Sequence, residues 1–305
     1  MFFARFWGVR GSIACPRNNT LKFGGNTSCI EIRTDKHIVI VDAGTGIYTL
    51  GQYLLAHDLK ERSIDADLFV THTHSDHISG FPMFPPLFFP ATKLRIRGPV
   101  MPGKISLEKA FSDYMSYAYW PVRLDELPSS ITFTQLGETT IDLDGGLVCK
   151  STYLNHPIVC LGYRFEYQGK SIVTAFDTEP YWNIFREGED GDSFFEDARF
   201  YGEEAAASEN KRLLEFYKNA DILIYDSQYT EEEYTPGRYH WGHSTYKSSV
   251  ETANQAGVKK LVLYHHDPQH TDDFLEEQEK HCKEHYNPGK GMEIIMSKEG
   301  MVIDA

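Results

Sequence analysis

The sequence is poor in cysteine and has no apolar stretch of membrane-span length. Its five cysteines are an odd number and include no CxxC pair: Cys15, Cys29, Cys149, Cys160 and Cys282. A chain of 305 residues can bury a large core without disulfide bonds, so we expect reduced thiols. The first residues also lack the basic region and apolar segment of a secretion signal. These absences predict a cytoplasmic protein that does not span a membrane.

Basic residues are outnumbered, because 30 Lys and Arg against 44 Asp and Glu give a formal net charge of −14. Proteins that bind long nucleic acids usually present a basic face that neutralises phosphates. The charge balance therefore argues against a long nucleic acid as the partner. Residues 1–40, however, carry six Lys and Arg against two acidic residues, which would suit a small anionic substrate.

Linkers, low-complexity tracts and internal repeats are absent as well. We therefore expect one domain over residues 1–305, with insertions near 101–130 and 180–218. Runs of β-branched and aromatic residues predict strands at 4–8, 29–33, 37–41, 68–71, 93–98, 147–153, 161–167, 171–175, 222–226 and 260–264. Helical periodicity predicts helices at 46–60, 105–118, 208–219, 245–256 and 272–285. This mixture indicates an α/β fold.

Several of the predicted strands run directly into polar residues. Asp42, His72, Asp177 and His265 each follow an apolar run closely. Because an α/β sheet assembles a site from the side chains at its strand ends, we expect these four residues to converge.

The densest group of potential metal ligands is the run from His72 to His77, which reads HTHSDH. Extended backbone places His72, His74 and Asp76 on one side, and His77 joins them if a helix begins there. Imidazoles with a carboxylate suit zinc or another first-row divalent ion. With remote ligands added, the run exceeds the needs of one ion and predicts a two-metal hydrolase. The alternative, a surface loop that is rich in histidine by chance, fits the preceding strand less well.

These residues give the sequence a resemblance to the metallo-β-lactamase superfamily, whose HxHxDH motif matches the His72 run. Further matches are Asp42 in VDAGTG, His156, Asp177 in AFDT and His265 in LVLYHHDP. The resemblance covers nearly the whole chain. It implies a four-layer αββα sandwich with two divalent metal ions at one edge between the sheets.

The resemblance also implies a role for each matched residue. His72, His74 and His156 would bind the first metal ion, Asp76, His77 and His265 the second, and Asp177 would bridge the two. Asp42 would orient a ligand or its loop. His266 competes with His265 for the last place, and we favour His265 because it follows the strand directly. Zinc is the first expectation for the ions and manganese the alternative.

Within the superfamily, the segments ADILIYDSQYT, WGHSTYKSSVETANQAG and VKKLVLYHHDP resemble ribonuclease Z and related small phosphodiesterases. There, a His-Ser/Thr pair opens a helix before the last metal-binding strand, and here that pair is His243-Ser244. The family role of this histidine is to protonate the leaving oxygen, which suits an imidazole near neutrality. The alternative is a residue that only helps to start the helix.

Ribonuclease Z itself grips tRNA with a long arm between the lone histidine and the bridging aspartate. His156 and Asp177 are only 21 positions apart, so that arm is missing. The segments FWGVRGSIACP and FGGNTSCIEI resemble the cyclic-nucleotide and small-molecule phosphodiesterases of this branch.

We therefore expect hydrolysis of small cyclic phosphodiesters, first of all 3′,5′-cyclic mononucleotides to nucleoside monophosphates, by a hydroxide held between two metals. Asp76 and His243 are the predicted catalytic residues. One alternative is a nuclease that acts on RNA ends, and another is a ligand sensor that keeps the fold without catalysis.

Substrate contacts carry the weakest signals. Arg10, Asn26 and Ser28 are candidates for phosphate binding, through a guanidinium or the backbone N–H groups of a glycine-containing loop. The aromatic segments 81–90, 114–120 and 181–201 are typical of either a pocket wall or a packing interface. Relatives in this branch are often homodimers, so the resemblance implies one here.

Overall fold

The structure is a computed structural model, and it describes residues 1–59, 63–101, 103, 105–185, 193–287 and 291–305. Two seven-stranded sheets form its centre. The first contains, in spatial order, β14 (Val302–Asp304), β1 (Phe2–Gly8), β2 (Cys29–Thr34), β3 (Ile38–Val41), β4 (Asp65–Phe69), β5 (Lys93–Pro99) and β6 (Ser130–Leu136). The second contains β13 (Glu293–Met296), β12 (Lys260–Tyr264), β11 (Ile222–Asp226), β10 (Lys170–Ala175), β9 (Leu161–Tyr167), β8 (Leu147–Tyr153) and β7 (Thr139–Asp142).

Each sheet has a parallel half and an antiparallel half. Strands β3 to β6 are mutually parallel, and so are β10 to β13, whereas the remaining neighbours pair antiparallel. The ten predicted strands are all present within a few residues. The prediction missed β6, β7, β13 and β14, which are the edge strands of the two sheets, where solvent exposure weakens the apolar pattern.

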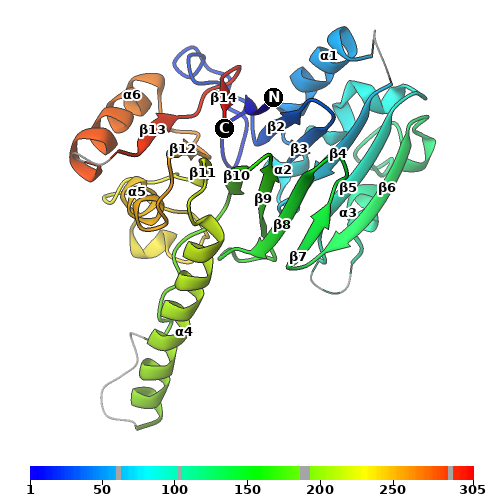
Figure 1. Cartoon of the computed structure of the whole chain (residues 1–305). Coiled ribbons are helices and arrows are strands. Elements are labelled where there is room, and N and C mark those ends of the chain that lie inside the picture. Colours follow the sequence, from blue (N-terminus) through cyan, green and yellow to red (C-terminus); the bar gives the residue numbers. More distant parts are fainter. Residues whose placement is uncertain (60–62, 102, 104, 186–192, 288–290) are drawn as a thin grey trace.

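Three apolar clusters separate the layers. The central one joins side chains of both sheets, such as Phe6 and Val41 from the first and Phe165 and Ile224 from the second. The outer face of the first sheet packs against α1 (Ile47–His57) and α3 (Leu107–Tyr114). The outer face of the second packs against α4 (Ser193–Tyr217), α5 (Tyr246–Gln255) and α6 (Asp272–His281). This arrangement confirms the predicted αββα sandwich (Figure 1).

Helix α4 is longer than the predicted 208–219 and extends away from the sandwich (Figure 1). Only its C-terminal end packs on the sheet, through Leu213 and Tyr217. Nearer its N-terminus, Phe200 and Tyr201 are exposed. Because this part lies away from the sheets, its sequence carries no apolar stripe, and periodicity cannot reveal it.

The aromatic segment 81–90 packs into the fold. It forms two short 3₁₀ helices, η1 (Phe81–Met83) and η2 (Pro85–Phe88), that lie against α1. Phe81, Phe84 and Leu87 are fully buried in the outer cluster of the first sheet. In segment 114–120, Tyr114 and Trp120 pack against the same cluster, whereas Tyr117 and Tyr119 are exposed.

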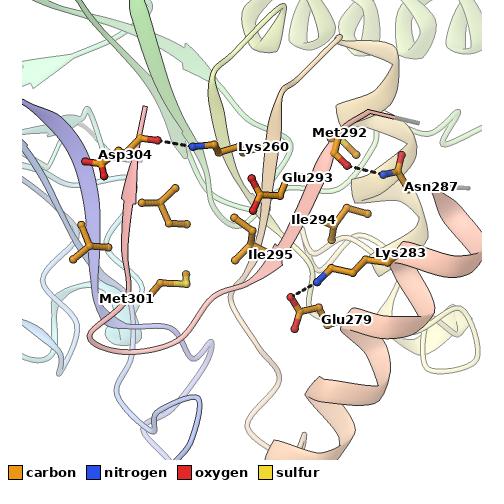
Figure 2. Close-up of a pocket in the computed structure, with 12 residues that line it drawn as sticks. Lys260, Glu279, Lys283, Asn287, Met292, Glu293, Ile294, Ile295, Met301 and Asp304 are labelled. Carbon is orange, nitrogen blue, oxygen red and sulfur yellow. Dashed lines mark hydrogen bonds and ion pairs between the residues drawn. The ribbon is translucent and has the colours of Figure 1, made fainter. Parts of the chain in front are cut away.

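A cavity of about 720 Å³ lies between β13 and β14, the edge strands of the two sheets (Figure 2). Its polar wall carries the Lys283–Glu279 ion pair and Lys260, which donates to the carbonyl of Asp304. Lys260 begins β12, whereas His265 follows the end of that strand. The cavity and the predicted metal ligands therefore lie at opposite ends of β12.

Among the residues that the structure describes, no helix combines the length and the apolar character needed to cross a bilayer.

Candidate metal centre

The site is built at the ends of neighbouring strands. Asp42 follows β3, the His72 run follows β4 and continues into α2 (Ser75–Ile78), Asp177 follows β10, and His265 follows β12. Asp42, Asp177 and His265 all have positive φ, at 61°, 51° and 66°. This backbone conformation is rare outside glycine, and such strain concentrates at functional sites. Here it directs the side chain that follows each strand toward the same point.

The structure brings all seven predicted ligands together in two groups that share Asp177. One contains His72, His74, His156 and Asp177, and the other contains Asp76, His77, Asp177 and His265. Within each group the potential ligand atoms all lie within 4.8 Å of one another.

In the second group, the Nε2 atoms of His77 and His265 each lie 3.2 Å from Oδ1 of Asp177 and 3.3 Å from Oδ2 of Asp76. In the first group, Nε2 of His72 lies 3.5 Å from Oδ2 of Asp177. Metal–ligand bonds of about 2.0–2.1 Å give ligand–ligand edges of about 3.3 Å in a tetrahedral site. Both groups therefore match the spacing of ligands around a metal ion.

Three buried atoms support this fit. Nε2 of His72, Nε2 of His77 and Oδ1 of Asp177 have no hydrogen-bond partner among the described residues. A buried polar atom without a partner is costly and calls for an explanation. All three belong to the ligand atoms of the two groups, so bound divalent cations would satisfy them.

The protonation states of the histidines in the two groups also suit the binding of metal ions. Burial lowers the pKa of His72 and His74, and it lowers that of His156 to about 4, so these rings are neutral, as metal ligands must be. Burial opposes protonation of His77 too, but Asp177, Asp76 and Asp42 outweigh it and raise its pKa well above the ordinary value. A cation placed between these carboxylates would displace the His77 proton.

Asp42 is bound to His77, one of the potential metal ligands. Its Oδ2 atom lies 2.7 Å from Nδ1 of His77, and its two oxygens accept hydrogen bonds from the backbone N–H and the hydroxyl of Thr71. Asp42 is fully buried. With Nδ1 bound to this carboxylate, Nε2 of His77 is left to face the cluster.

The two adjacent histidines, His265 and His266, have different surroundings. Nδ1 of His265 lies 3.0 Å from the side-chain oxygen of Gln228, and its Nε2 atom faces Asp76 and Asp177. His266 lies outside the cluster, where its Nε2 atom contacts the carbonyl of Ser297 at 2.9 Å. The geometry therefore favours His265 as the ligand.

His243 lies beside both ligand groups. Its ring centroid is 5.6 Å from that of His156 and 5.1 Å from that of His265. Its Nδ1 atom is 2.8 Å from Oδ2 of Asp226, and burial is outweighed by this carboxylate, which raises the pKa of His243 to about 9. The cap of α5 is Thr245, whose side chain accepts from the N–H of Ser248, so His243 is not needed for capping.

The side chains of the three residues predicted to contact phosphate are buried or bound to other residues of the protein. Arg10 is fully buried, and its guanidinium donates to the carbonyls of Gly24, Asp267 and His270. These contacts correct the expectation for Arg10, because they leave its side chain in a structural role. The side-chain amide of Asn26 is bound to Glu299 and Thr45, and Ser28 is fully buried.

Sequence reasoning missed several residues that position the ligands. The N–H of Ser12 donates to Oδ2 of Asp76 at 2.7 Å, and a Cβ on Gly11 would lie 2.5 Å from the His265 ring. Gln228 and Asp226 orient His265 and His243. Only Asp226 had a signal, since it ends an apolar strand in the same way that Asp42 and Asp177 follow theirs.

Comparison with known proteins agrees with this architecture. The family model for the beta-lactamase superfamily domain matches residues 37–266. Ribonuclease Z of Thermoplasma acidophilum is 26% identical over 314 aligned residues, which cover 94% of this chain and 94% of that protein. Among solved structures, the metallo-beta-lactamase fold protein YhfI from Bacillus subtilis aligns with a TM-score of 0.64 and 18% identity, covering 100% of this chain and 99% of YhfI. A diphosphatase of the PhnP family gives 0.64 and 17%, covering 100% and 98%.

The family match covers most of the chain, and its matched range contains the complete set of ligands from the His72 run to His265. The chain therefore belongs to the metallo-β-lactamase superfamily, as a ribonuclease Z-like hydrolase with a site suited to divalent metal ions.

Proposed function

We propose that this hydrolase cleaves small cyclic phosphodiesters, with 3′,5′-cyclic mononucleotides as the first candidates and nucleoside monophosphates as their products. The observation that carries the proposal is the pairing of a seven-ligand metal cluster with His243, a histidine that is bound to a buried carboxylate. A phosphodiesterase needs both parts, one to activate water and neutralise phosphoryl charge and the other to protonate the leaving alkoxide.

His72, His74 and His156 would hold one cation, Asp76, His77 and His265 the other, and Asp177 would contact both. When bound, such a pair of divalent cations lowers the pKa of a water molecule and offsets the charge that develops on a phosphoryl group. We propose zinc, with manganese as the alternative, because neutral imidazoles and carboxylates suit both ions.

His243 would donate the proton to the leaving oxygen. Asp226 binds its Nδ1 atom, which leaves Nε2 as the donating atom. The second oxygen of Asp226 accepts the N–H of Ser244 at 2.8 Å, so the carboxylate is fixed from two sides. A sugar alkoxide is a poor leaving group, and a protonated imidazole is the group it needs.

The segment between His156 and Asp177 supports a small substrate. It consists of β9, β10 and a tight turn, with Tyr167 paired to Lys170 across the hairpin. That segment has no space for an RNA-gripping arm. Helix α4 projects from the protein but is poorly suited to replace such an arm. Its sequence contains six acidic residues against three basic ones and would repel a phosphate backbone.

A nuclease that acts on RNA ends is the second candidate. The similarity to ribonuclease Z of Thermoplasma acidophilum over 94% of both chains favours it. We further propose a homodimer in the cytoplasm. The five cysteines support a reducing compartment, since all are free and buried.

A substrate panel tests the choice. The purified protein, loaded with Zn²⁺ or Mn²⁺, is incubated with 3′,5′-cyclic mononucleotides, cyclic dinucleotides and a precursor tRNA. We expect turnover of cyclic mononucleotides, and cleavage of the tRNA alone would overturn the proposal. The variant Asp76→Ala should abolish turnover. Intact activity in that variant would instead point to a contaminating enzyme or to a ligand-sensing role.

The role of His243 has its own readout. Replacement by Gln should lower kcat for the cyclic nucleotide by roughly 10²–10⁴-fold, the usual contribution of a general acid. A phosphodiester with a p-nitrophenolate leaving group needs no protonation, so its hydrolysis should fall far less. Equal losses on both substrates would assign His243 to another role.

A further inference from the structure

An aromatic cavity of about 450 Å³ lies outside the metal cluster, and none of the potential metal ligands lines it. It is formed by the segment after Asp177 and by the loop before His243. The side chains that shape it are Trp182, Ile184, Tyr234, Pro236 and Tyr239. Its volume falls in the range of small-molecule sites, and its walls are mostly apolar and aromatic, as such sites are.

The cavity adjoins a second one that reaches His243, because Trp182 and Tyr234 line both. A smaller cavity of about 160 Å³ is lined by Trp182 and Tyr234 on one side and by His243 and Ser244 on the other. Tyr229 lies between His243 and Tyr234. Its ring centroid is 6.1 Å from that of His243 and 6.3 Å from that of Tyr234. The aromatic cavity therefore lies one ring contact away from the surroundings of the proton donor.

Helix α4 holds one wall of the cavity. The side chain of Asn210 binds the N–H and the carbonyl of Tyr181 at 2.8 and 3.0 Å. The amide of Asn183 donates to the carbonyl of Arg199 at 2.7 Å. These contacts fix the backbone on both sides of Trp182, a residue that is 44% exposed and thus available for stacking.

Glu179 holds the opposite wall. This buried carboxylate accepts hydrogen bonds from the hydroxyl of Tyr234 and from the N–H groups of His240 and Gly242, both at 3.3 Å. Glu179 comes two residues after Asp177. The position of the Tyr234 ring is therefore fixed relative to the metal cluster.

The rings are arranged as a stacking surface. Trp182 and Tyr234 are nearly parallel, with 28° between their planes and 6.4 Å between centroids, and Tyr239 lies 4.8 Å from Tyr234. The smaller cavity carries the carboxylates of Glu231 and Glu251, with Lys247 as the counter-charge. This charge disfavours a further phosphate group, whereas a neutral planar ring meets no penalty.

We propose that the cavity formed by Trp182, Tyr234 and Tyr239 binds the nucleobase of the substrate. This inference rests on the proposed phosphodiesterase function and assigns the residues that select a nucleotide over another phosphodiester. Stacking of a base on an aromatic side chain changes affinity by roughly 5- to 150-fold. The effect should appear in KM, because the base does not take part in bond cleavage.

The test compares a substrate with a base and one without. Trp182→Ala and Tyr239→Ala are assayed with 3′,5′-cyclic AMP and with a ribose 3′,5′-cyclic phosphate that carries a methoxy group in place of the base. We expect KM for cyclic AMP to rise about tenfold or more, with kcat/KM for the base-free compound unchanged. Both side chains are partly exposed, at 44% and 41%, so the variants should fold, which a thermal melt checks.

Tyr119→Ala is the control, because Tyr119 is 80% exposed and does not line the cavity. It should match the wild type on both substrates. An unchanged KM for cyclic AMP in the cavity variants, or an equal loss on both substrates, would overturn the base site while leaving the phosphodiesterase function intact. A change in oligomeric state with unaltered nucleotide binding would overturn it too, in favour of an interface.

A second measurement keeps the inference testable if the wild type turns over no cyclic nucleotide. Calorimetric titration with adenosine and guanosine 5′-monophosphates measures binding without turnover. Tighter binding to the wild type and Tyr119→Ala than to Trp182→Ala would support the base site although the proposed reaction had failed. Equal affinities would overturn the site.

Discussion

Nδ1 of His243 lies 2.8 Å from Oδ2 of Asp226, and the other oxygen of this carboxylate accepts the N–H of Ser244. Asp226 is fully buried at the end of β11. It therefore fixes the imidazole and favours its charged form against burial, which gives His243 a pKa of about 9. At neutral pH the ring is protonated, as a proton donor must be.

Replacing Asp226 with Asn should move the alkaline limb of the pH–rate profile to lower pH. A group with a raised pKa is protonated below it and loses its proton as the pH rises through it, so activity that needs protonated His243 falls there. Without the charge of Asp226, that fall begins earlier. Each unit by which the pKa of His243 falls should lower the rate about tenfold at pH values above that pKa. The measurement is kcat/KM between pH 6 and 10, with metal content checked in parallel, and an unmoved limb would contradict the role of Asp226.

Asp42→Asn should weaken one metal site selectively. Asp42 binds Nδ1 of His77 and no other ligand, so the site that contains His77 should lose about 10–100-fold in affinity. Titration with Zn²⁺ under a competing chelator would show one tight and one weakened ion. Asp67→Asn is the matched control, because Asp67 is also a buried strand carboxylate but binds Arg95 and Arg97. Its variant should lose stability and keep both ions, and equal metal loss in both variants would refute the assignment.

Variants of the adjacent residues His265 and His266 should give different results in the same Zn²⁺ titration. His265→Ala removes a side chain that faces Asp76 and Asp177, and we expect it to bind one ion tightly in place of two. His266→Ala removes a buried contact with Ser297, so it should lower the melting temperature and retain both ions. Loss of an ion in the His266 variant alone would reverse the choice between them.

The sequence predicted the αββα sandwich, and the residues that it named as ligands lie together in the structure, because both features depend on local patterns. Buried strands give apolar runs, and the ligands follow the ends of four of them. The groups that orient the ligands were not predictable in this way. The N–H of Ser12 and the amide of Gln228 act through backbone position and tertiary contact, neither of which leaves a pattern in the sequence.

The candidate phosphate contacts show where sequence charge misleads. Arg10 was a candidate for phosphate binding, yet its guanidinium donates to three backbone carbonyl groups. The charge pattern of a sequence does not reveal burial. An arginine that donates to buried backbone carbonyls gives the same pattern as an arginine exposed to solvent. The aromatic segments were ambiguous for a similar reason. Composition cannot distinguish Phe84, fully buried in a core cluster, from Trp182, which lines a cavity.

Gly202 offers a test of the aromatic cavity that leaves every ring in place. A Cβ at this position would lie 2.3 Å from Oδ1 of Asn183, the residue that ties the Trp182 segment to α4. Gly202→Ala should favour the helix by about 0.5–1 kcal/mol, since glycine is costly in a helix interior. The same change displaces the Asn183 side chain, so we expect KM for cyclic nucleotides to rise severalfold without a loss of thermal stability.

Asn183→Ala should raise KM in the same way, because it removes the same hydrogen bond to Arg199 from the other side. If Gly202→Ala acts through Asn183, the double variant should show no more than the loss of the single Asn183 variant. Additive losses would mean that Gly202 acts by another route. A KM equal to that of the wild type in both single variants would show that the tie between α4 and the Trp182 segment does not set the shape of the cavity.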